Sequence, residues 1–540
     1  MHLRFLFILL LIQPLLYWQG LFGGFVFDDR FLIVETMGQV SFQGIWFSGL
    51  WEGEAEQANF YRPLFSTTIW LDQKMFGLNA FGYHLHSLLW HCINIVLFAR
   101  FTTFILEASQ SRIATLIFST HPLLSEVVFW ISARNDTMAL TFVLAFLCIL
   151  CSRISMEGAD SPKDSFNAKT NVLLLLCFLG GMLSKESALM IFIPMLWMGW
   201  RYKRGRVLLT AMLMLTGLLF WWRHQIGIDA PELNHASMLN VWNGSLPMIV
   251  DGFGRLLFPW RLSPATPIAW LSTFWWQVGL ALCTIGLLIK AISMQQNRMW
   301  IVWIFAGVVL SMPAIVYTGN IGDRYWAMSL IGWSLLVAQL ISNRWVWLPI
   351  PFWMVTIFLR GAAWTSDLAF WSQEYALNPT PYSAVSLALI QYNEQEFSSA
   401  MYGFYEGFSA EPPHLDGCTE FVSSVLSVEG AESALQASQW SIERGCPNDG
   451  LMLGLQSVIL VDLEQWTEVE EIAQQKIEDP SRRLDVVRTL LDWRQGNEIS
   501  FCQRVSSWTD KQRLFKQLEI LSKSDFQTMN NAPCFPSYEE

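Results

Sequence analysis

The first 31 residues, MHLRFLFILLLIQPLLYWQGLFGGFVFDDRF (1–31), place two acidic side chains directly after a long apolar run. The run over residues 3–22 is about as long as a helix that crosses the hydrocarbon core of a membrane. It starts with the basic Arg4 and lacks a small-residue cleavage site, so it differs from a removable signal peptide. We therefore predict an uncleaved first membrane helix with a cytoplasmic N-terminus, which places Asp28 and Asp29 on the outer side.

The composition of the whole chain agrees with this interpretation. Of its 540 residues, 53% are hydrophobic and only 15% are charged, whereas soluble domains carry about 25% charged residues. The net charge of −11 is unevenly distributed, because residues 361–540 carry −16 and the remainder carries +5. We predict a membrane domain followed by an acidic soluble domain, and this acidity argues against nucleic acid as a partner.

Apolar runs continue through the first two thirds of the chain and predict an all-α, polytopic membrane domain with about eleven spans. The connections expected inside are basic, as in Arg100, Arg112 and RYKRGR (201–206), which matches the positive-inside rule. Eleven spans that start inside place the C-terminal domain outside. The predicted spans are 3–22, 84–104, 112–130, 136–152, 171–184, 187–200, 207–222, 273–290, 299–317, 325–342 and 345–360.

We predict three consecutive parts. Residues 1–360 form the membrane domain with an outer loop at 23–63, residues 361–378 form a linker, and residues 379–540 form helical hairpins. Small and aromatic residues in the third part match the positions of a tetratricopeptide repeat, and the alternative is a plain helical bundle. The matching residues are Leu387, Ala388, Ala400, Phe404, Gly407 and Pro412.

Cysteines in the third part indicate its compartment. Cys418, Cys446, Cys502 and Cys534 all lie in the domain that we place outside. An even number of cysteines in an oxidising compartment permits two disulfides, in any of three connectivities.

Charged side chains gather in the predicted outer loops, although a charge near the bilayer centre costs about 2.5–3.5 kcal/mol. Each alone could be a salt-bridged or snorkelling structural group, but six clusters at one face predict a shared polar site. Besides the acidic pair, the candidates are Arg30, Arg62, His121, Glu126, Arg134, Asp136, Lys185, Glu186, Arg255, Asp323 and Arg324. Some of these residues have a structural alternative. Lys185 with Glu186, and Arg134 with Asp136, could each form only a local ion pair. His121 could be a helix-breaking cap, and Arg255 could anchor a lipid head group.

Six segments in this order carry a family resemblance. They are GGFVFDDRFLIVE (23–35), NFYRPLFSTTIWLD (59–72), HPLLSEVVFWISARNDTMAL (121–140), GGMLSKESALMIFIPMLWMGW (180–200), LLFPWRLSP (256–264) and GDRYWAMSLIGW (322–333). The set resembles the transmembrane and tetratricopeptide-repeat O-mannosyltransferases, which are polyprenyl-phosphate-dependent glycosyltransferases of the GT-C fold. The last segment lacks the proline of the family's pattern, so donor or acceptor preference can differ.

The resemblance implies transfer of a sugar, mannose in that family, from a polyprenyl-phosphate donor to a protein Ser/Thr hydroxyl with inversion. Asp28 or Asp29 would accept the proton of the hydroxyl. Lys185, Arg255 and Arg324 would hold the donor phosphate, and the other candidates would line the cavity.

Adjacent carboxylates repel, so a nearby cation is expected. Arg30, Arg62 and a divalent metal ion are the alternatives, and no metal ligands are assigned.

The partners implied are the lipid-linked sugar, membrane lipids and a protein acceptor bound by the C-terminal domain. Short inner loops favour a bacterial homologue in the inner membrane, with the C-terminal domain in the periplasm; in other cells it would be luminal. A lipid or glycan acceptor is one alternative. A transporter or non-catalytic scaffold is another, although a transporter would place its charges near mid-membrane and often shows an internal repeat.

Overall fold

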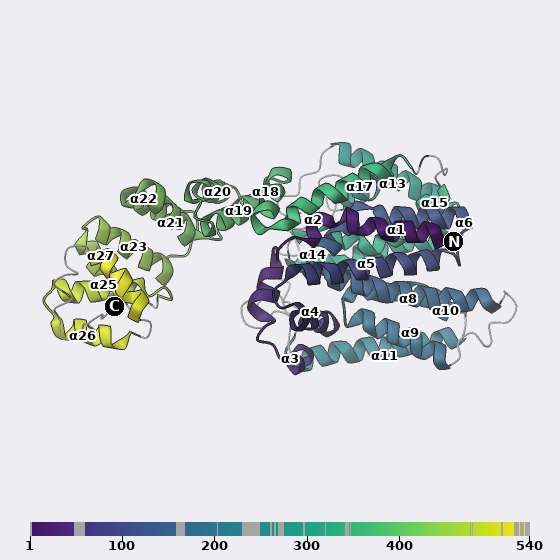
Figure 1. Cartoon of the computed structure of the whole chain (residues 1–540), viewed down its shortest axis with the longest axis horizontal. Coiled ribbons are helices and arrows are strands. Elements are labelled where there is room, and N and C mark those ends of the chain that lie inside the picture. Colours follow the sequence, from purple (N-terminus) through teal and green to yellow (C-terminus); the bar gives the residue numbers. More distant parts are fainter. Residues whose placement is uncertain are drawn as a thin grey trace. The chain divides into compact units, whose positions relative to one another are not determined.

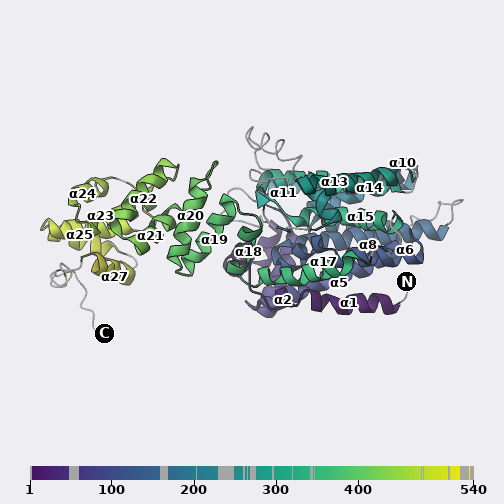
Figure 2. The same cartoon turned by 90° about the horizontal axis from the view of Figure 1, so that it is seen from above.

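The computed structural model divides into two compact units, Met1–Asn378 and Pro379–Glu540, which we describe separately (Figures 1 and 2). The residues that it describes are 3–47, 60–157, 168–201, 203–228, 249–259, 262–263, 266–267, 275–294, 297–318, 320–340, 345, 347–475, 477, 479–508, 511–522, 529 and 534.

The first unit is helical, which confirms the all-α prediction, apart from one pair of two-residue strands, β1 (Thr266–Pro267) and β2 (Asn320–Ile321). Figure 1 shows α5, α8, α9 and α11 packed in this order along a common direction. The helices are α1 (Leu3–Leu16), α2 (Trp18–Leu21), η1 (Arg30–Thr36), α3 (Phe42–Phe47), α4 (Pro63–Phe76), α5 (Ala80–Thr102), α6 (Ala108–Thr120), η2 (Pro122–Leu124), α7 (Ser125–Phe129), η3 (Ile131–Ala133), α8 (Arg134–Glu157), α9 (Ala168–Met182), η4 (Glu186–Ile191), α10 (Phe192–Arg201), α11 (Lys203–Gln225), α13 (Trp275–Ile292), α14 (Arg298–Thr318), η7 (Asp323–Trp326), α15 (Ala327–Leu340), α17 (Pro349–Arg360), η8 (Gly361–Thr365) and α18 (Asp367–Leu377).

Helices coincide with all the predicted apolar runs. Within the described residues, two segments are both long and apolar enough to span a membrane, Ile131–Ile154 and Gly205–Gln225. The count of about eleven spans therefore stays a prediction.

The run predicted over residues 112–130 is not one continuous helix. Helix α6 ends at Thr120, and His121 is extended with a ψ of 124° before the short η2 and α7 follow. The break arises because Pro122 disfavours the helical conformation for the residue before it.

The segment 361–378, which we predicted as a linker, instead forms η8 and α18 within the first unit. Ser366 caps α18 by accepting a hydrogen bond from the Ala369 backbone N–H. Thr365 O accepts from Gly24 N at 2.9 Å, so this segment holds the loop that leads to the acidic pair. Of the predicted outer loop 23–63, residues 48–59 lie outside the described part of the chain.

The second unit consists of consecutive helices that pack as hairpins. A Cβ atom at Gly407 would clash with Val385 Cγ2, so a glycine lets the first two helices approach closely. Two apolar cores fill the unit, one around Phe404 and Phe421 and one around Val487 and Phe501. The helices are α19 (Pro381–Asn393), α20 (Phe397–Ser409), α21 (Cys418–Glu429), α22 (Ala431–Glu443), α23 (Gly450–Asp462), α24 (Trp466–Ala473), α25 (Arg483–Arg494), α26 (Glu498–Ser507) and α27 (Lys511–Ser522).

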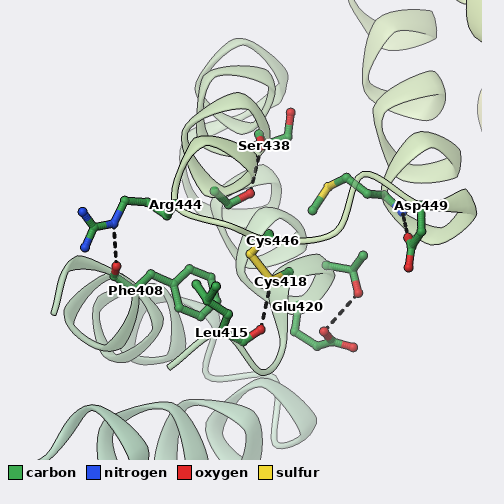
Figure 3. The surroundings of a disulfide bond; sticks show 11 residues. Phe408, Leu415, Cys418, Glu420, Ser438, Arg444, Cys446 and Asp449 are labelled. Carbon is green, nitrogen blue, oxygen red and sulfur yellow. Dashed lines mark hydrogen bonds between the residues drawn. A yellow bond between two sulfur atoms is a disulfide. The ribbon is translucent and has the colours of Figure 1, made fainter. Parts of the chain in front are cut away.

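Disulfides join Cys418 to Cys446 and Cys502 to Cys534, so the structure selects one of the three connectivities. The first ties the start of α21 to the loop after α22 (Figure 3). Beside it, Arg444 Nε donates to Phe408 O at 2.8 Å. The end of α22 is therefore fixed both to its own hairpin and to α20.

Candidate active site

The acidic pair lies at a tight bend whose backbone is held from two sides. Phe27 has a φ of 60°, which is unusual for a residue other than glycine. Its N–H donates to Asp367 Oδ1 at 2.7 Å, and its ring packs against Trp130 and Phe370. Such locally strained backbone persists where the surroundings fix it, and it is common at functional sites.

After the bend, the chain is anchored in an apolar core. Leu32 and Ile33 of η1 are fully buried against Phe65 of α4, Tyr83 of α5 and Met138 of α8. This packing fixes the position of the two acids relative to the long helices.

Asp29 is buried and fully engaged by the protein. Its carboxylate accepts hydrogen bonds from the Ser132 N–H at 2.7 Å, the Ser132 hydroxyl at 2.5 Å and the Ile131 N–H at 3.3 Å. Burial raises the pKa of Asp29 to about 7, while the hydrogen bonds from Ser132 act in the opposite direction. Asp29 therefore fastens η1 to η3.

Asp28 is half-buried, and its side chain lacks the kind of hydrogen bonds that Asp29 accepts from described residues. Its side chain makes no hydrogen bond or ion pair with any residue in the described ranges. Burial raises the pKa of Asp28 to about 6, and the positive charge of Arg324 acts in the opposite direction. The carboxylate of Asp28 is thus available near a cation.

Arg324, whose charge lowers the pKa of Asp28, forms an ion pair with a second acid, Glu126. Its Nη1 donates to Glu126 Oε1 at 2.7 Å, and its guanidinium lies 4.7 Å from the centre of the Trp130 ring. Glu126 is fully buried, and it also accepts a bond from the Arg324 backbone N–H at 3.2 Å.

A network of alternating charges continues from Glu126. Arg360 Nη2 lies 4.0 Å from Glu126 and 2.7 Å from Asp323 Oδ2, and Asp323 Oδ1 accepts from Arg255 at 2.5 Å. Arg255 also pairs with Asp251 at 2.6 Å. Because Arg255 lies between two carboxylates, its charge is already neutralised within the network.

A glycine permits this arrangement of the network. Residues 249–257 are helical, and a Cβ at Gly252 would clash with the Trp326 ring. Glycine therefore lets the helix that carries Arg255 approach η7, which carries Asp323.

The two local ion pairs that were the structural alternatives, Arg134 with Asp136 and Lys185 with Glu186, do not form. Arg134 is fully buried and donates to Asp72 Oδ2 at 2.5 Å. Asp136 instead accepts from Lys185 Nζ at 2.5 Å. Burial lowers the pKa of Lys185 to about 8, while Asp136 raises it and the nearby charges of Arg62 and Arg324 lower it further.

Glu186 likewise does not pair with its neighbour Lys185. It accepts from Arg62 Nη2 at 3.4 Å and from Arg223 Nη1 at 3.1 Å. Together with Tyr61, Met182, Leu183, Leu219 and Phe220, Glu186 and Arg223 line a pocket.

Two further candidates, His121 and Arg30, have different surroundings. His121 is buried, its Nδ1 accepts from Leu123 N and its Nε2 donates to Leu256 O at 3.1 Å, so it forms the cap that was the structural alternative for this residue. Arg30 is exposed, and its charge acts on Asp367.

Sequence reasoning missed Asp72, Arg223, Asp251 and Arg360, although each is a charged residue in or beside an apolar run. Within the described ranges, no group of three His, Cys, Asp or Glu side chains could hold a metal ion.

Comparison with known proteins adds independent information. Human TMTC3, a protein O-mannosyl-transferase, is 31% identical over 152 residues, which are 27% of this chain and 16% of that protein. Human TMTC1, also a protein O-mannosyl-transferase, is 32% identical over 191 residues, or 33% of this chain and 21% of that protein. The chain is similar to protein O-mannosyl-transferases. A protein O-mannosyl-transferase of Caenorhabditis elegans is 27% identical over 202 residues, or 35% of this chain and 27% of that protein.

These matches confirm the resemblance inferred from the six segments. They span between 16% and 27% of the length of the relatives. No protein-family profile matches the chain, and no solved structure matches it. The bacterial origin stays a prediction.

Proposed function

We propose that this chain is a multi-pass membrane glycosyltransferase that moves a sugar, mannose, from a polyprenyl-phosphate donor to a protein Ser/Thr hydroxyl on the outer face. The observation that carries the proposal, beside the similarity to protein O-mannosyl-transferases, is the state of Asp28. The other acids described above each accept a hydrogen bond or form an ion pair, whereas Asp28 retains a carboxylate that can accept a proton.

Asp28 is therefore the base in our mechanism. Its carboxylate takes the proton of the acceptor hydroxyl while the hydroxyl oxygen attacks the sugar carbon from the face opposite the phosphate. One bond to the anomeric carbon forms as the other breaks, so the configuration inverts. Asp29 positions Asp28 by fixing the backbone on which both residues lie.

The leaving phosphate is stable as an anion and needs cations rather than a strong acid. Lys185 and Arg324 supply them. Lys185 lies close enough to Arg324 for its pKa to be affected, and Arg324 in turn acts on Asp28. Arg255, which we expected to hold phosphate, instead stabilises the position of Asp323.

The eleven apolar runs bring these groups to one face, where a lipid-linked donor is delivered. The acidic hairpin unit, with its tetratricopeptide-like first repeat, offers a surface to the protein acceptor.

The test uses the purified full chain in nanodiscs with a mixture of unfolded Ser/Thr-rich proteins. Radiolabelled mannose is supplied on a polyprenyl phosphate or, in a parallel reaction, on a nucleotide diphosphate. We expect labelled protein from the lipid donor alone. Label from the nucleotide donor alone, or label found in lipid or glycan and not in protein, would contradict the proposed donor or acceptor. No transfer with any carrier sugar would favour the scaffold alternative.

A further inference from the structure

A second polar feature lies where the ends of α9 and α11 approach the start of α4. The pocket there has apolar walls formed by Met182, Leu183, Leu219 and Phe220. Its polar part consists of Glu186, Arg223 and the Tyr61 side chain. The Tyr61 hydroxyl is fixed because it accepts from Trp222 Nε1 and donates to Trp46 O, both at 3.1 Å.

Glu186 bridges Arg223, which lines the pocket, to Arg62, which is outside the lining and reaches it through this carboxylate. Arg223 and Arg62 bind different oxygens of its carboxylate, at 3.1 and 3.4 Å. The Glu186 side chain is 31% exposed. Its carboxylate can therefore move into solvent when another anion binds the two arginines. A phosphate presents the same kind of paired oxygens to guanidinium groups.

The two arginines retain capacity for a further anion. Arg62 is 8% exposed, and its Nε–H has no hydrogen-bond partner in the described part of the chain. A buried donor without a partner is unfavourable, so an added acceptor would be bound there. Two guanidinium groups also face a single carboxylate, so within the described ranges this cluster carries one positive charge in excess.

The surroundings indicate what brings the anion. Helix α11 meets the length and composition of a membrane span, and only 17% of its apolar window is buried within the protein. Leu213, Met214, Leu218 and Trp221 are each more than half exposed. A helix with this apolar outer face is expected to contact lipid tails, and its final turns contribute Leu219, Phe220 and Arg223 to the pocket lining.

We propose that this pocket binds the phosphate of a lipid, with Arg62 and Arg223 as its ligands and Glu186 as an internal carboxylate that the phosphate displaces. The apolar walls contact the first carbons of the lipid chain. A polyprenyl phosphate is one such lipid, so the site deepens the function proposed above by giving its donor an entry point beside Lys185. An anionic phospholipid carries the same phosphate chemistry.

The test measures binding and requires no sugar transfer, so its result is independent of the proposed reaction. Purified full chain in detergent is titrated with farnesyl phosphate, phosphatidylglycerol or uncharged farnesol, and bound lipid is counted by native mass spectrometry. The variants are Arg223→Gln and Glu186→Gln. Arg206→Gln is the matched control, because Arg206 is exposed near the other end of α11.

Loss of a charged hydrogen bond predicts that Arg223→Gln weakens farnesyl phosphate binding by about 10-fold or more, while Arg206→Gln leaves it unchanged. Glu186→Gln should tighten binding by about 3-fold or more, because the competing carboxylate is gone. If Glu186 formed only a structural ion pair, Glu186→Gln would instead weaken farnesyl phosphate binding, because loss of the pair could only loosen the pocket.

Binding of farnesyl phosphate but not phosphatidylglycerol assigns the site to a prenyl carrier, and equal binding of both assigns it to lipid phosphates in general. Farnesol that binds as tightly as farnesyl phosphate would overturn the proposal. So would an Arg223→Gln variant that binds like Arg206→Gln, or a Glu186→Gln variant that binds as weakly as Arg223→Gln.

Discussion

At the residue scale, Asp28 and Asp29 are adjacent in sequence but have different environments. Asp29 receives three hydrogen bonds from Ile131 and Ser132, while Asp28 faces the charge of Arg324. The sequence predicted an acidic pair with one base and could not tell which residue it was. That distinction depends on η3, about 100 residues away in the chain.

The pH dependence of transfer follows from Asp28. Burial raises the pKa of Asp28 to about 6, and only the ionised carboxylate can accept a proton. Activity should therefore be lost as the pH falls through about 6 and should be nearly constant above about pH 7. Initial rates at saturating donor between pH 5 and 8 measure this. A rate that stays constant down to pH 5 would exclude Asp28 as the base.

The stability of the two asparagine variants separates their roles. Asp29→Asn should lower the free energy of unfolding by about 2–3 kcal/mol, because an amide places donors against the N–H groups that the carboxylate binds. Asp28→Asn should change it by less than about 0.5 kcal/mol. Thermal unfolding in detergent compares the two, with the exposed Glu35→Gln as control. Equal destabilisation by both would show that Asp28 also has a structural partner.

Charge pairing was the least predictable feature of the site. Neighbouring residues were considered as partners, yet Arg134 pairs with Asp72 across 62 positions and Lys185 with Asp136 across 49. Such partners are set by which helices pack together, and apolar periodicity carries no information on that. The cap formed by His121 was one of the two alternatives drawn from the sequence, because a residue before proline disfavours the helical conformation.

At the element scale, Arg134 joins three helices. From the start of α8 it reaches Asp72 on α4, and it donates to Ser87 Oγ and Tyr83 O on α5 at 3.0 and 2.8 Å. Since η3 directly precedes α8, this junction also fixes the position of η3, whose Ser132 binds Asp29.

Removing the acid from this junction leaves a buried cation without its partner. Asp72→Asn should lower the free energy of unfolding by about 3–5 kcal/mol. Lys74→Gln on the same helix, where the side chain is exposed, should change it by less than about 1 kcal/mol. Denaturant unfolding of the purified variants measures both. Similar values for the two would mean that water or a neighbouring group compensates Arg134.

The hairpin of α21 and α22 depends on the Cys418–Cys446 disulfide, which closes a loop with a sequence separation of 28. Replacing both cysteines by serine should cost about 3 kcal/mol, and protease cleavage between α20 and α23 should become faster. Cys283→Ser, which alters an exposed free thiol, is the control. Unchanged proteolysis would show that the apolar core alone maintains the hairpin.

Helices were predicted better than their ends and connections. Apolar runs located the helices of the first unit because their length and composition suffice for that. The helical segment 361–378 was not predicted, since it depends on contacts with Gly24 and Phe27.

At the scale of the whole molecule, the two units differ in net charge and in the groups that they contain. The basic first unit contains the acidic pair, the charge network and the pocket at α11, and the acidic second unit contains the disulfides. The central claim is that the first unit transfers a lipid-linked sugar with Asp28 as base.

The most direct test compares wild type, Asp28→Asn and Glu35→Gln in the same nanodiscs with radiolabelled polyprenyl-phosphate mannose and protein acceptor. Glu35 is exposed in the same segment, so its variant controls for the loss of a carboxylate. We predict that Asp28→Asn loses at least about 100-fold in rate, within the range for general base catalysis, while it retains the thermal stability of wild type and Glu35→Gln retains activity. A folded Asp28→Asn variant that transfers mannose at the wild-type rate would contradict the account.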